Sequence, residues 1–491
     1  MSSQNNSSFK PSLGLLDGTM IVAGSMIGSG IFIVSADIVR NVGGSGWLIL
    51  VWLITGFMTV TAAISYGELS GMFPKAGGQY VYLKEAYNPL VGFMYGWSFF
   101  SVIQTGTIAA VGVAFSKFAA YVVPDSLVQY VSEDNKLLTL HFGSGNFTIS
   151  AAQVVSIILI ILLTYSNTRG LKGSKWIQNI FTSTKLLSLF GLIAAGFIMF
   201  NPAVWHANWA NAWQATKEVL NDAAHPTTGS VITPIAGAAL LGGIAAAMVG
   251  SVFSSDAWNN VTFIAGEMRN PKKNIGLSLL FGTLIVTIIY VSMNLVYLST
   301  LTLPEIAHAD RGRVAIAASN AIFGNGGAIV IGIMIMISTF GCNNGLILAG
   351  ARVYYTMAQD KLFFKKAATL NKNAVPEWAL WAQCVVAAIL CLSGKYGDLL
   401  DMISFVVVIF YVLTISGIFI LRVKQPNAER PYKAFGYPFL PAIYIVMGIS
   451  FCVLLIIYKP EYTWPGLIIA LIGIPLYYLA VPKKTISPDS N

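Results

Sequence analysis

Charged residues, histidine and cysteine are all scarce in this chain of 491 residues. Only 10% of the residues are charged, against about 25% in average soluble domains. The four cysteines (Cys342, Cys384, Cys391, Cys452) fall in or beside apolar runs. This placement argues against an extracellular disulfide framework. The four histidines (His141, His206, His225, His308) have no ligand-like spacing, so we expect neither a metal site nor a cofactor.

Long apolar runs occupy most of the chain. Hydrophobic residues make up 56% of it, and a helix that crosses a bilayer needs about 20 mostly apolar residues. Twelve runs meet this length, centred near Ile27, Leu53, Ala110, Ile158, Phe190, Ser251, Ile288, Ile335, Val386, Ile409, Met447 and Ile472. We therefore expect an all-α membrane protein of twelve transmembrane helices, with little chain left for a soluble domain.

The distribution of basic residues predicts the orientation. The formal net charge is +9, and most of the 29 lysines and arginines lie in the two tails and in alternate loops. Because cytoplasmic loops carry the excess of lysine and arginine, both termini are expected in the cytoplasm. The basic charge is thereby explained by topology, and we expect no nucleic-acid partner. No cleavable signal pattern precedes the first run, so we expect the N-terminal tail to be retained.

The first apolar run contains the stretch GSMIGSG, Gly24 to Gly30. Each glycine in a helix interior costs about 1 kcal/mol relative to alanine, so three in seven residues favour an unwound segment. A second interpretation is that Gly24 and Gly28 only let another helix approach closely. Nucleotide binding is excluded, because the glycine-rich fingerprints of such sites are incomplete here.

The sixth run is interrupted in a similar way by GSVFSSDAW, Gly250 to Trp258. Paired interruptions in corresponding helices of two halves are typical of transporter binding sites. We therefore expect inverted five-helix repeats at residues 13–201 and 230–423, two further helices at 438–481, and tails at 1–12 and 482–491.

Unwound backbone within a membrane must be buried or line a cavity. A helix that restarts near Gly30 offers free N–H groups and a positive dipole end, which suit a carboxylate. Free carbonyls around Phe253 to Ser255 suit an ammonium group. A small ligand that carries both groups is an amino acid.

Six motifs extend this interpretation to a family. They are GSGIF (Gly28 to Phe32), YGELSGMFPKAGGQYVYLKEAY (Tyr66 to Tyr87), IFTSTKLL (Ile180 to Leu187), FSSDAWNN with GEMRNP (Phe253 to Pro271), STFGCNNG (Ser338 to Gly345) and ERPYK (Glu429 to Lys433). Through them nearly the whole chain resembles the amino acid–polyamine–organocation superfamily. Within it the chain is similar to the L-amino acid transporter family, whose animal members are the light chains of heteromeric transporters.

The resemblance implies a LeuT-type fold of inverted five-helix repeats with helices 1 and 6 broken, and sodium-independent exchange. It places the carboxylate of the substrate at Ile27, Gly28, Ser29 and Gly30 and the amino group at Phe253, Ser254 and Ser255, with the Phe253 ring as an outer gate. Gln104 and Tyr411 would line the same pocket. Light chains carry a cysteine that bonds the heavy subunit, and none lies between Val122 and Ser150. We therefore expect no disulfide-linked heavy subunit and a prokaryotic cell membrane.

Three of the charged residues within or at the ends of the runs are candidates for a role in the site. Lys185 lies near the middle of the fifth run, where a lysine costs about 2.5 to 3.5 kcal/mol and needs a polar partner. In the family, this lysine occupies the place of a sodium ion and steadies carbonyls near Ile27 and Gly28. Asp256 either faces the side chain of the substrate or, with Ser255, caps the helix that follows. Glu68 is expected to pack against backbone or loop cations rather than carry protons.

These observations favour a secondary transporter that exchanges small neutral amino acids between the cell and its surroundings by alternating access. A proton-coupled or cationic amino acid transporter is the nearest alternative. A receptor that binds an amino acid without moving it would have the same pocket. The placement of histidine and cysteine disfavours an enzyme.

Overall fold

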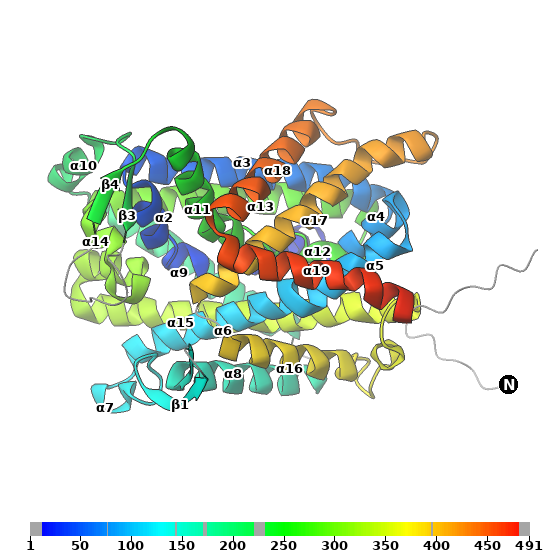
Figure 1. The fold of residues 1–491 in the computed structure, drawn as a ribbon, viewed down its shortest axis with the longest axis horizontal. Helices are drawn as coiled ribbons and strands as arrows, with labels where there is room; N and C mark the ends of the chain where they lie inside the picture. Colours follow the sequence, from blue (N-terminus) through cyan, green and yellow to red (C-terminus); the bar gives the residue numbers. More distant parts are fainter. Residues whose placement is uncertain are drawn as a thin grey trace, which may run out of the picture.

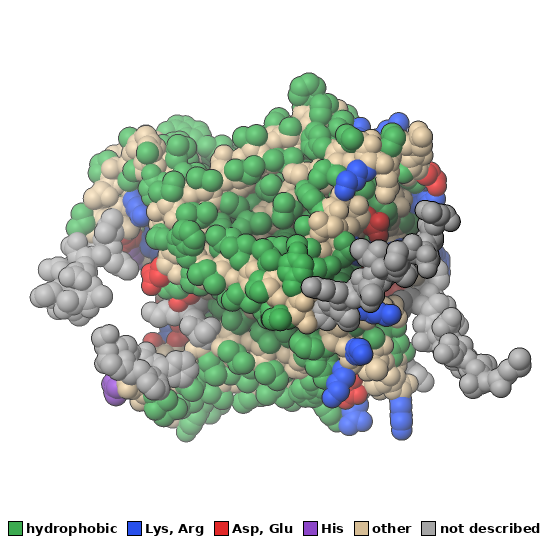
Figure 2. All heavy atoms as spheres, turned by 45° about the vertical axis from the view of Figure 1, so that its right-hand side comes forward, with side chains coloured by type: hydrophobic (Ala, Val, Ile, Leu, Met, Phe, Trp, Pro, Cys, Tyr) green, Lys and Arg blue, Asp and Glu red, His purple; other side chains and the backbone are tan. Residues whose placement is uncertain are grey.

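The computed structural model describes residues 12–75, 77–142, 145–169, 174–219, 231–393 and 396–480. His225, most of the two tails and parts of five loops lie outside this description. Within it the chain is a bundle of long helices (Figure 1). Figure 2 shows a broad belt of hydrophobic side chains, with lysine and arginine gathered toward one end. This distribution is that of a multi-pass membrane protein.

Ten helical stretches in the described chain are long and apolar enough to cross a membrane. They are α3 (Ser45–Met72), α5 with α6 (Pro89–Ser98 and Gln104–Val122), α8 (Ala151–Thr168), α9 (Ser174–Ile198), α11 (Gly237–Ser254), α13 (Pro271–Thr300), α15 (Val314–Gln359), α17 (Tyr396–Lys424), α18 (Phe439–Tyr458) and α19 (Pro460–Ala480). Two shorter apolar helices are α1 (Leu15–Met26) and α16 (Glu377–Ser393). The ten long stretches correspond to ten of the predicted runs, and the runs centred near Ile27 and Val386 contain only the shorter helices α1 and α16.

Shorter elements connect and cap the long helices. The helical ones are η1 (Gly30–Phe32), α2 (Ser35–Val42), α4 (Gln79–Ala86), the π-helical turn η2 (Phe99–Ile103), α7 (Asp125–Val128), α10 (Pro202–Trp209), α12 (Asn260–Phe263), η3 (Ala265–Glu267), α14 (Leu303–Ala307), η4 (Asp310–Gly312) and η5 (Lys365–Ala368). Several begin with local signals. Asn88, for example, accepts a hydrogen bond from the N–H of Val91 immediately before Pro89 opens α5, as expected of a helix start.

Four short strands depart from the all-α expectation. β1 (Lys136–Phe142) pairs antiparallel with β2 (Gly145–Ser150), and β3 (Thr216–Val219) pairs antiparallel with β4 (Val231–Pro234). Both pairs lie in connections between long helices, at the end of the molecule away from α4 (Figure 1). They lengthen two loops on that side and leave the helical core unchanged.

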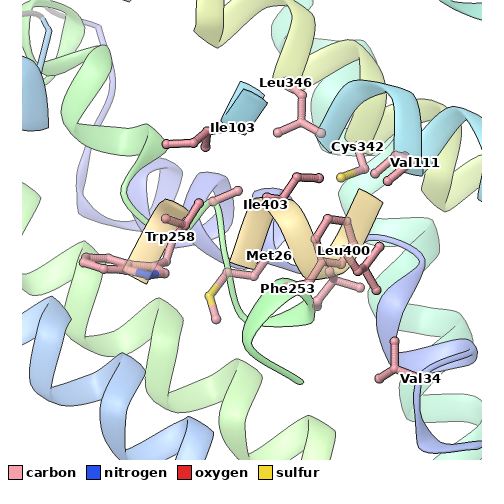
Figure 3. Packing of buried hydrophobic residues seen from close by; sticks show 14 of the residues in the cluster. Met26, Val34, Ile103, Val111, Phe253, Trp258, Cys342, Leu346, Leu400 and Ile403 are labelled. Carbon is pink, nitrogen blue, oxygen red and sulfur yellow. The ribbon is translucent and has the colours of Figure 1, made fainter. Parts of the chain in front are cut away.

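The core brings the interrupted helices to the centre of the bundle. α1 packs along α13, and α11 packs against α2 and α17. Figure 3 shows Met26 and Phe253, one from each interrupted helix, among apolar side chains from α15 and α17, including Leu346 and Leu400. These four side chains are buried. The two interruptions therefore lie close together inside the protein.

Candidate functional site

The first interruption begins where α1 ends at Met26. Residues Ile27, Gly28 and Ser29 are not helical, and the chain resumes as the short 3-10 turn η1 at Gly30. The expected half-helix therefore starts as a tight turn, and α2 follows it from Ser35. The break falls within the glycine-rich stretch from which it was predicted.

The second interruption follows α11, which ends at Ser254. Residues 255–259 are not helical, and α12 begins at Asn260. Ala257 has a φ of 61°, which is uncommon for a residue other than glycine and indicates a constrained backbone. Because Asn259 directly precedes α12, neither Ser255 nor Asp256 occupies the capping position. The carboxylate of Asp256 instead accepts a hydrogen bond from the hydroxyl of Tyr411.

The two interruptions touch at Gly30 and Ser254. A Cβ atom on Gly30 would lie 1.9 Å from Ser254 Oγ and 3.1 Å from Ser254 Cα. Any side chain at Gly30 would thus clash with the second interruption. The glycine is required by this approach of two backbone segments, a stronger constraint than helix weakness alone.

Buried side chains hold the carbonyl groups that the first interruption frees. Lys185 Nζ donates to the carbonyl oxygens of Gly24 at 2.7 Å and Ile27 at 2.9 Å. Tyr297 Oη donates to Ile31 O at 3.1 Å. Together they satisfy backbone groups that lipid cannot satisfy.

Lys185 is 1% exposed and reaches the interruption from α9. It contacts Ile27 as the sequence suggested, but its second carbonyl belongs to Gly24 instead of Gly28. An ammonium among carbonyl oxygens makes the same kind of contact that a hard cation makes with oxygen ligands.

A single hydroxyl joins the two interruptions. Tyr290 Oη, from α13, lies 3.0 Å from Met26 O and 2.9 Å from Ser254 O. These are the last residues of α1 and α11. This role could not be predicted from the sequence, because aromatic residues in apolar helices are mostly packing or interfacial groups.

Three small cavities surround the interruptions, each about 10 to 20 Å³ in volume, roughly the size of one water molecule. Asp256 lines all three. The walls of the first cavity also include Gln104, Tyr411 and Asn260, and those of the second include Ser255. The third cavity is lined by residues of both interruptions and by α15: Gly28, Ser29, Gly30, Phe253, Ser254 and Cys342. The structure thus gathers nine of the ten predicted binding residues around three small cavities that share Asp256. Ile27 is buried, lines none of these cavities and contributes its carbonyl group.

Two further residues at this site went unnoticed in the sequence. Asn260 is 4% exposed, and its Nδ2 has no hydrogen-bond partner among the described residues. Tyr396 begins α17 and lies 3.1 Å from Ser29, between their hydroxyl oxygens. Asn260 directly follows the interruption and could have been suspected, whereas Tyr396 is distant in sequence.

Glu68 forms an anchor away from the interruptions. Its carboxylate accepts two hydrogen bonds from Arg422, at 2.9 and 2.7 Å, and one from the backbone N–H of Ala434 at 2.7 Å. Arg430 lies 3.4 Å from the same carboxylate. These contacts fasten the end of α3 to α17 and to the segment that joins α17 and α18, and they are of the backbone and cation kind expected for Glu68.

A larger cavity of about 450 Å³ lies at the end of the bundle that carries α4. Its walls include Lys75, Lys84, Arg352 and Asp360. Lys84 Nζ and Tyr80 Oη donate to Asp360, at 2.6 and 2.8 Å. Burial, and next the bond to Asp360, raise the pKa of Tyr80 above its ordinary value, so its phenol remains a neutral donor.

The start of α1 is tied down beside this cavity. The N–H groups of Ser12 and Leu13 donate to Glu267 O at 2.9 and 3.0 Å, and Arg269 N donates to Leu13 O at 2.8 Å. The carboxylate of Glu267 pairs with Arg352 at 2.9 Å. These bonds attach the start of α1 to η3 and, through Glu267 and Arg352, to α15.

A helical membrane bundle with two broken helices meeting at its centre defines a polytopic membrane protein of the transporter class. The comparisons specify the family. A family profile described as "Amino acid permease" matches residues 13–477, and the chain belongs to this family, part of the amino acid–polyamine–organocation superfamily.

Individual relatives align over nearly the whole chain. It is 27% identical over 480 residues to the human "Large neutral amino acids transporter small subunit 2", covering 96% of this chain and 81% of the relative. It is 27% identical over 478 residues to the "Serine/threonine exchanger SteT" of Bacillus subtilis (strain 168), covering 97% and 98%. It is 25% identical over 481 residues to the mouse "b(0,+)-type amino acid transporter 1", covering 97% and 89%.

Proposed function

We propose that this protein exchanges small neutral L-amino acids of the alanine, serine, cysteine and threonine type across the cell membrane, without sodium. The observation that carries the proposal is the contact between the two interrupted helices at Gly30 and Ser254. It brings the freed N–H groups of one helix and the freed carbonyls of another to one buried place. The relatives, which are named as amino acid transporters and in one case as a serine/threonine exchanger, support the same function.

The proposed architecture has twelve crossings. The first combines α1, η1 and α2, the sixth combines α11 with α12, and α16 is the ninth. Residues 13–201 and 230–423 would form inverted repeats of the LeuT type, followed by helices in 438–481. Both termini would lie in the cytoplasm, which makes the charged cavity an inner vestibule. Alternating access would arise from rocking of the repeats about the central site.

The carboxylate of the substrate would bind at Ser29, Gly30 and Ile31. Gly28 N already donates to Met26 O at 2.8 Å, and the first bond inside η1 runs from Phe32 N to Ser29 O. The N–H groups between them lie at the open end of the turn, where anions bind. The proposed carboxylate site is therefore shifted along the chain from the predicted segment Ile27 to Gly30: it adds Ile31, and Ile27 and Gly28 would mainly shape the backbone.

The ammonium group would bind to carbonyls of the second interruption. Ser254 O already accepts from Tyr290 and Phe253 O from the N–H of Asp256 at 3.2 Å, so Ser255 O is the proposed main acceptor, with Phe253 O beside it. The Phe253 ring would cover the substrate from outside. Its side chain, 7% exposed, would move when the outer path opens.

Lys185 would replace a sodium ion. Its ammonium group would bind Gly24 O and Ile27 O, where a sodium-coupled transporter would require the ion. Exchange would then need neither sodium nor a cofactor, and no enzymatic step is proposed. Because residues 122–150 contain no cysteine, the protein is proposed to work without a disulfide-linked heavy subunit, in a prokaryotic membrane.

Asp256 supports one competing function, transport of cationic amino acids. Its buried carboxylate borders all three central cavities, and a carboxylate there would attract a cationic side chain. The hydroxyl of Tyr411 already bonds it, which favours its use as an acceptor for neutral hydroxylated substrates.

Uptake into liposomes tests the proposal. Purified protein is reconstituted, and labelled L-alanine uptake is measured into empty vesicles and vesicles loaded with unlabelled L-alanine. Uptake only into loaded vesicles, unchanged when choline replaces sodium or a proton gradient is imposed, would support exchange. Accumulation in empty vesicles driven by protons would establish the proton-coupled alternative.

A further inference from the structure

Tyr396 touches both interruptions at once. Its hydroxyl oxygen lies 3.1 Å from Ser29 Oγ in the first interruption. Its ring meets the ring of Phe253 edge to face, with centroids 6.1 Å apart and an interplanar angle of 84°. The side chain is 4% exposed, so it seals the region where the two segments come together.

A series of contacts through charged side chains leads from Tyr396 to the protein surface. Lys117 Nζ, from α6, lies 5.4 Å from the centroid of the Tyr396 ring, within the range of a cation–π contact. The same ammonium lies 3.4 Å from Glu133 Oε1. Glu133 follows α7, on the side that the charge distribution predicts to be extracellular. The contacts thus connect an outer loop to the centre of the site.

We propose that Tyr396 stabilises the closed state of the outer gate, and we call it the latch of that gate. This inference rests on the proposed exchange function. Substrate can enter from outside only if the first turn of α17 separates from Ser29 and Phe253. The contacts of Tyr396 would therefore exist only in states closed to the outside. A contact present in one of two states shifts their populations by its own free energy.

The replacement Tyr396→Phe tests the latch, because it removes the bond to Ser29 and keeps the ring. Initial exchange rates are measured in liposomes of uniform orientation, with labelled L-alanine varied outside and then inside. Loss of one hydrogen bond should increase the outward-open population by about two- to tenfold. The external KM should fall and the internal KM should rise, each by up to this factor.

Opposite movement of the two KM values separates a latch from general damage. Tyr354→Phe is the matched control, because the Tyr354 hydroxyl is buried and has no partner among the described residues. It should leave both values unchanged. Lys117→Gln is a second variant that keeps Tyr396 intact. It should also lower the external KM and raise the internal KM, each by a smaller factor than Tyr396→Phe.

Two results would overturn the latch. If both KM values rise together in Tyr396→Phe, the hydroxyl assists substrate binding and does not hold the gate. If neither value moves in Tyr396→Phe or Lys117→Gln, the contacts do not bias the gate. A wild-type protein without exchange activity would instead refute the proposed function, and the latch with it.

Discussion

The hydroxyl oxygen of Tyr290 lies within hydrogen-bond distance of the carbonyl oxygens of both Met26 and Ser254, at 3.0 and 2.9 Å, so the two carbonyls share its one proton. One side chain of α13 therefore holds the ends of two helices that are more than 200 residues apart in sequence. Their relative position depends on a bond that either helix would lose if it moved alone. The site is thus assembled by long-range contacts as well as by the local breaks.

Tyr290→Phe should destabilise the protein by about 1 to 3 kcal/mol, because two buried carbonyls lose a donor. Thermal unfolding in detergent would show a lower midpoint, and exchange should slow. Tyr354→Phe is the control, since its hydroxyl has no hydrogen-bond partner in the described part of the chain and can be removed at little cost. Equal midpoints for the two variants would show that the shared bond contributes no stability.

Gly30→Ala should prevent exchange, because its Cβ would lie 1.9 Å from Ser254 Oγ and 2.7 Å from Ser254 Cβ. Overpacking of a buried contact costs about 1 to 3 kcal/mol. Adding Ser254→Gly removes both clashing atoms and should restore part of the stability lost. A Gly30→Ala protein with normal transport would disprove the close approach of the interruptions.

Lys185→Ala should abolish exchange, since Gly24 O and Ile27 O would lose their donor. Lys185→Met is the better-matched variant, because it keeps most of the side-chain volume without the charge. Both should reduce the maximal exchange rate at least about tenfold, equivalent to roughly 1.4 kcal/mol. Full transport by either variant would rule out the sodium-replacing role.

Asp256→Asn should leave L-alanine exchange nearly intact and weaken L-serine relative to L-alanine about two- to tenfold, the value of one hydrogen bond. Alanine has no side-chain group to bond the carboxylate, whereas the serine hydroxyl can donate to it. Competition against labelled L-alanine measures both affinities. If wild-type protein also takes up lysine, and only this uptake is lost, the cationic alternative gains support.

Glu68→Gln should lower stability by about 3 to 5 kcal/mol, the cost of leaving a buried ion pair without one partner. Arg422 and Arg430 would both lose their carboxylate. Surviving protein should still exchange amino acids, and a proton gradient should have no effect on it or on the wild type. If a proton gradient drives uptake by the wild type and Glu68→Gln removes this effect, Glu68 is a proton carrier.

Local sequence signals predicted the helices and both interruptions. Glycine weakens a helix wherever it occurs, so the stretch Gly24 to Gly30 predicted the first break without any information about the residues that pack against it. The buried charge of Lys185 likewise demanded a partner near the middle of the bundle. These predictions needed only local physical chemistry.

Other parts of the site depend on the tertiary arrangement. Tyr290 and Tyr396 resemble ordinary apolar-helix aromatics in sequence, and only the packing of α13 and α17 gives their hydroxyls a function. The need for glycine at Gly30 comes from Ser254, which lies in another helix. The strands β1 to β4 were missed because short alternating segments in loops carry a weak signal beside long apolar runs.

Ligand binding to the purified protein tests the central site most directly. Equilibrium binding of L-alanine would be compared with that of alaninamide, which lacks the carboxylate, and propionate, which lacks the ammonium group. If the two interruptions each hold one charge of the substrate, only L-alanine should bind, with each analogue at least about tenfold weaker. Binding of either analogue as tightly as L-alanine would contradict the proposed site.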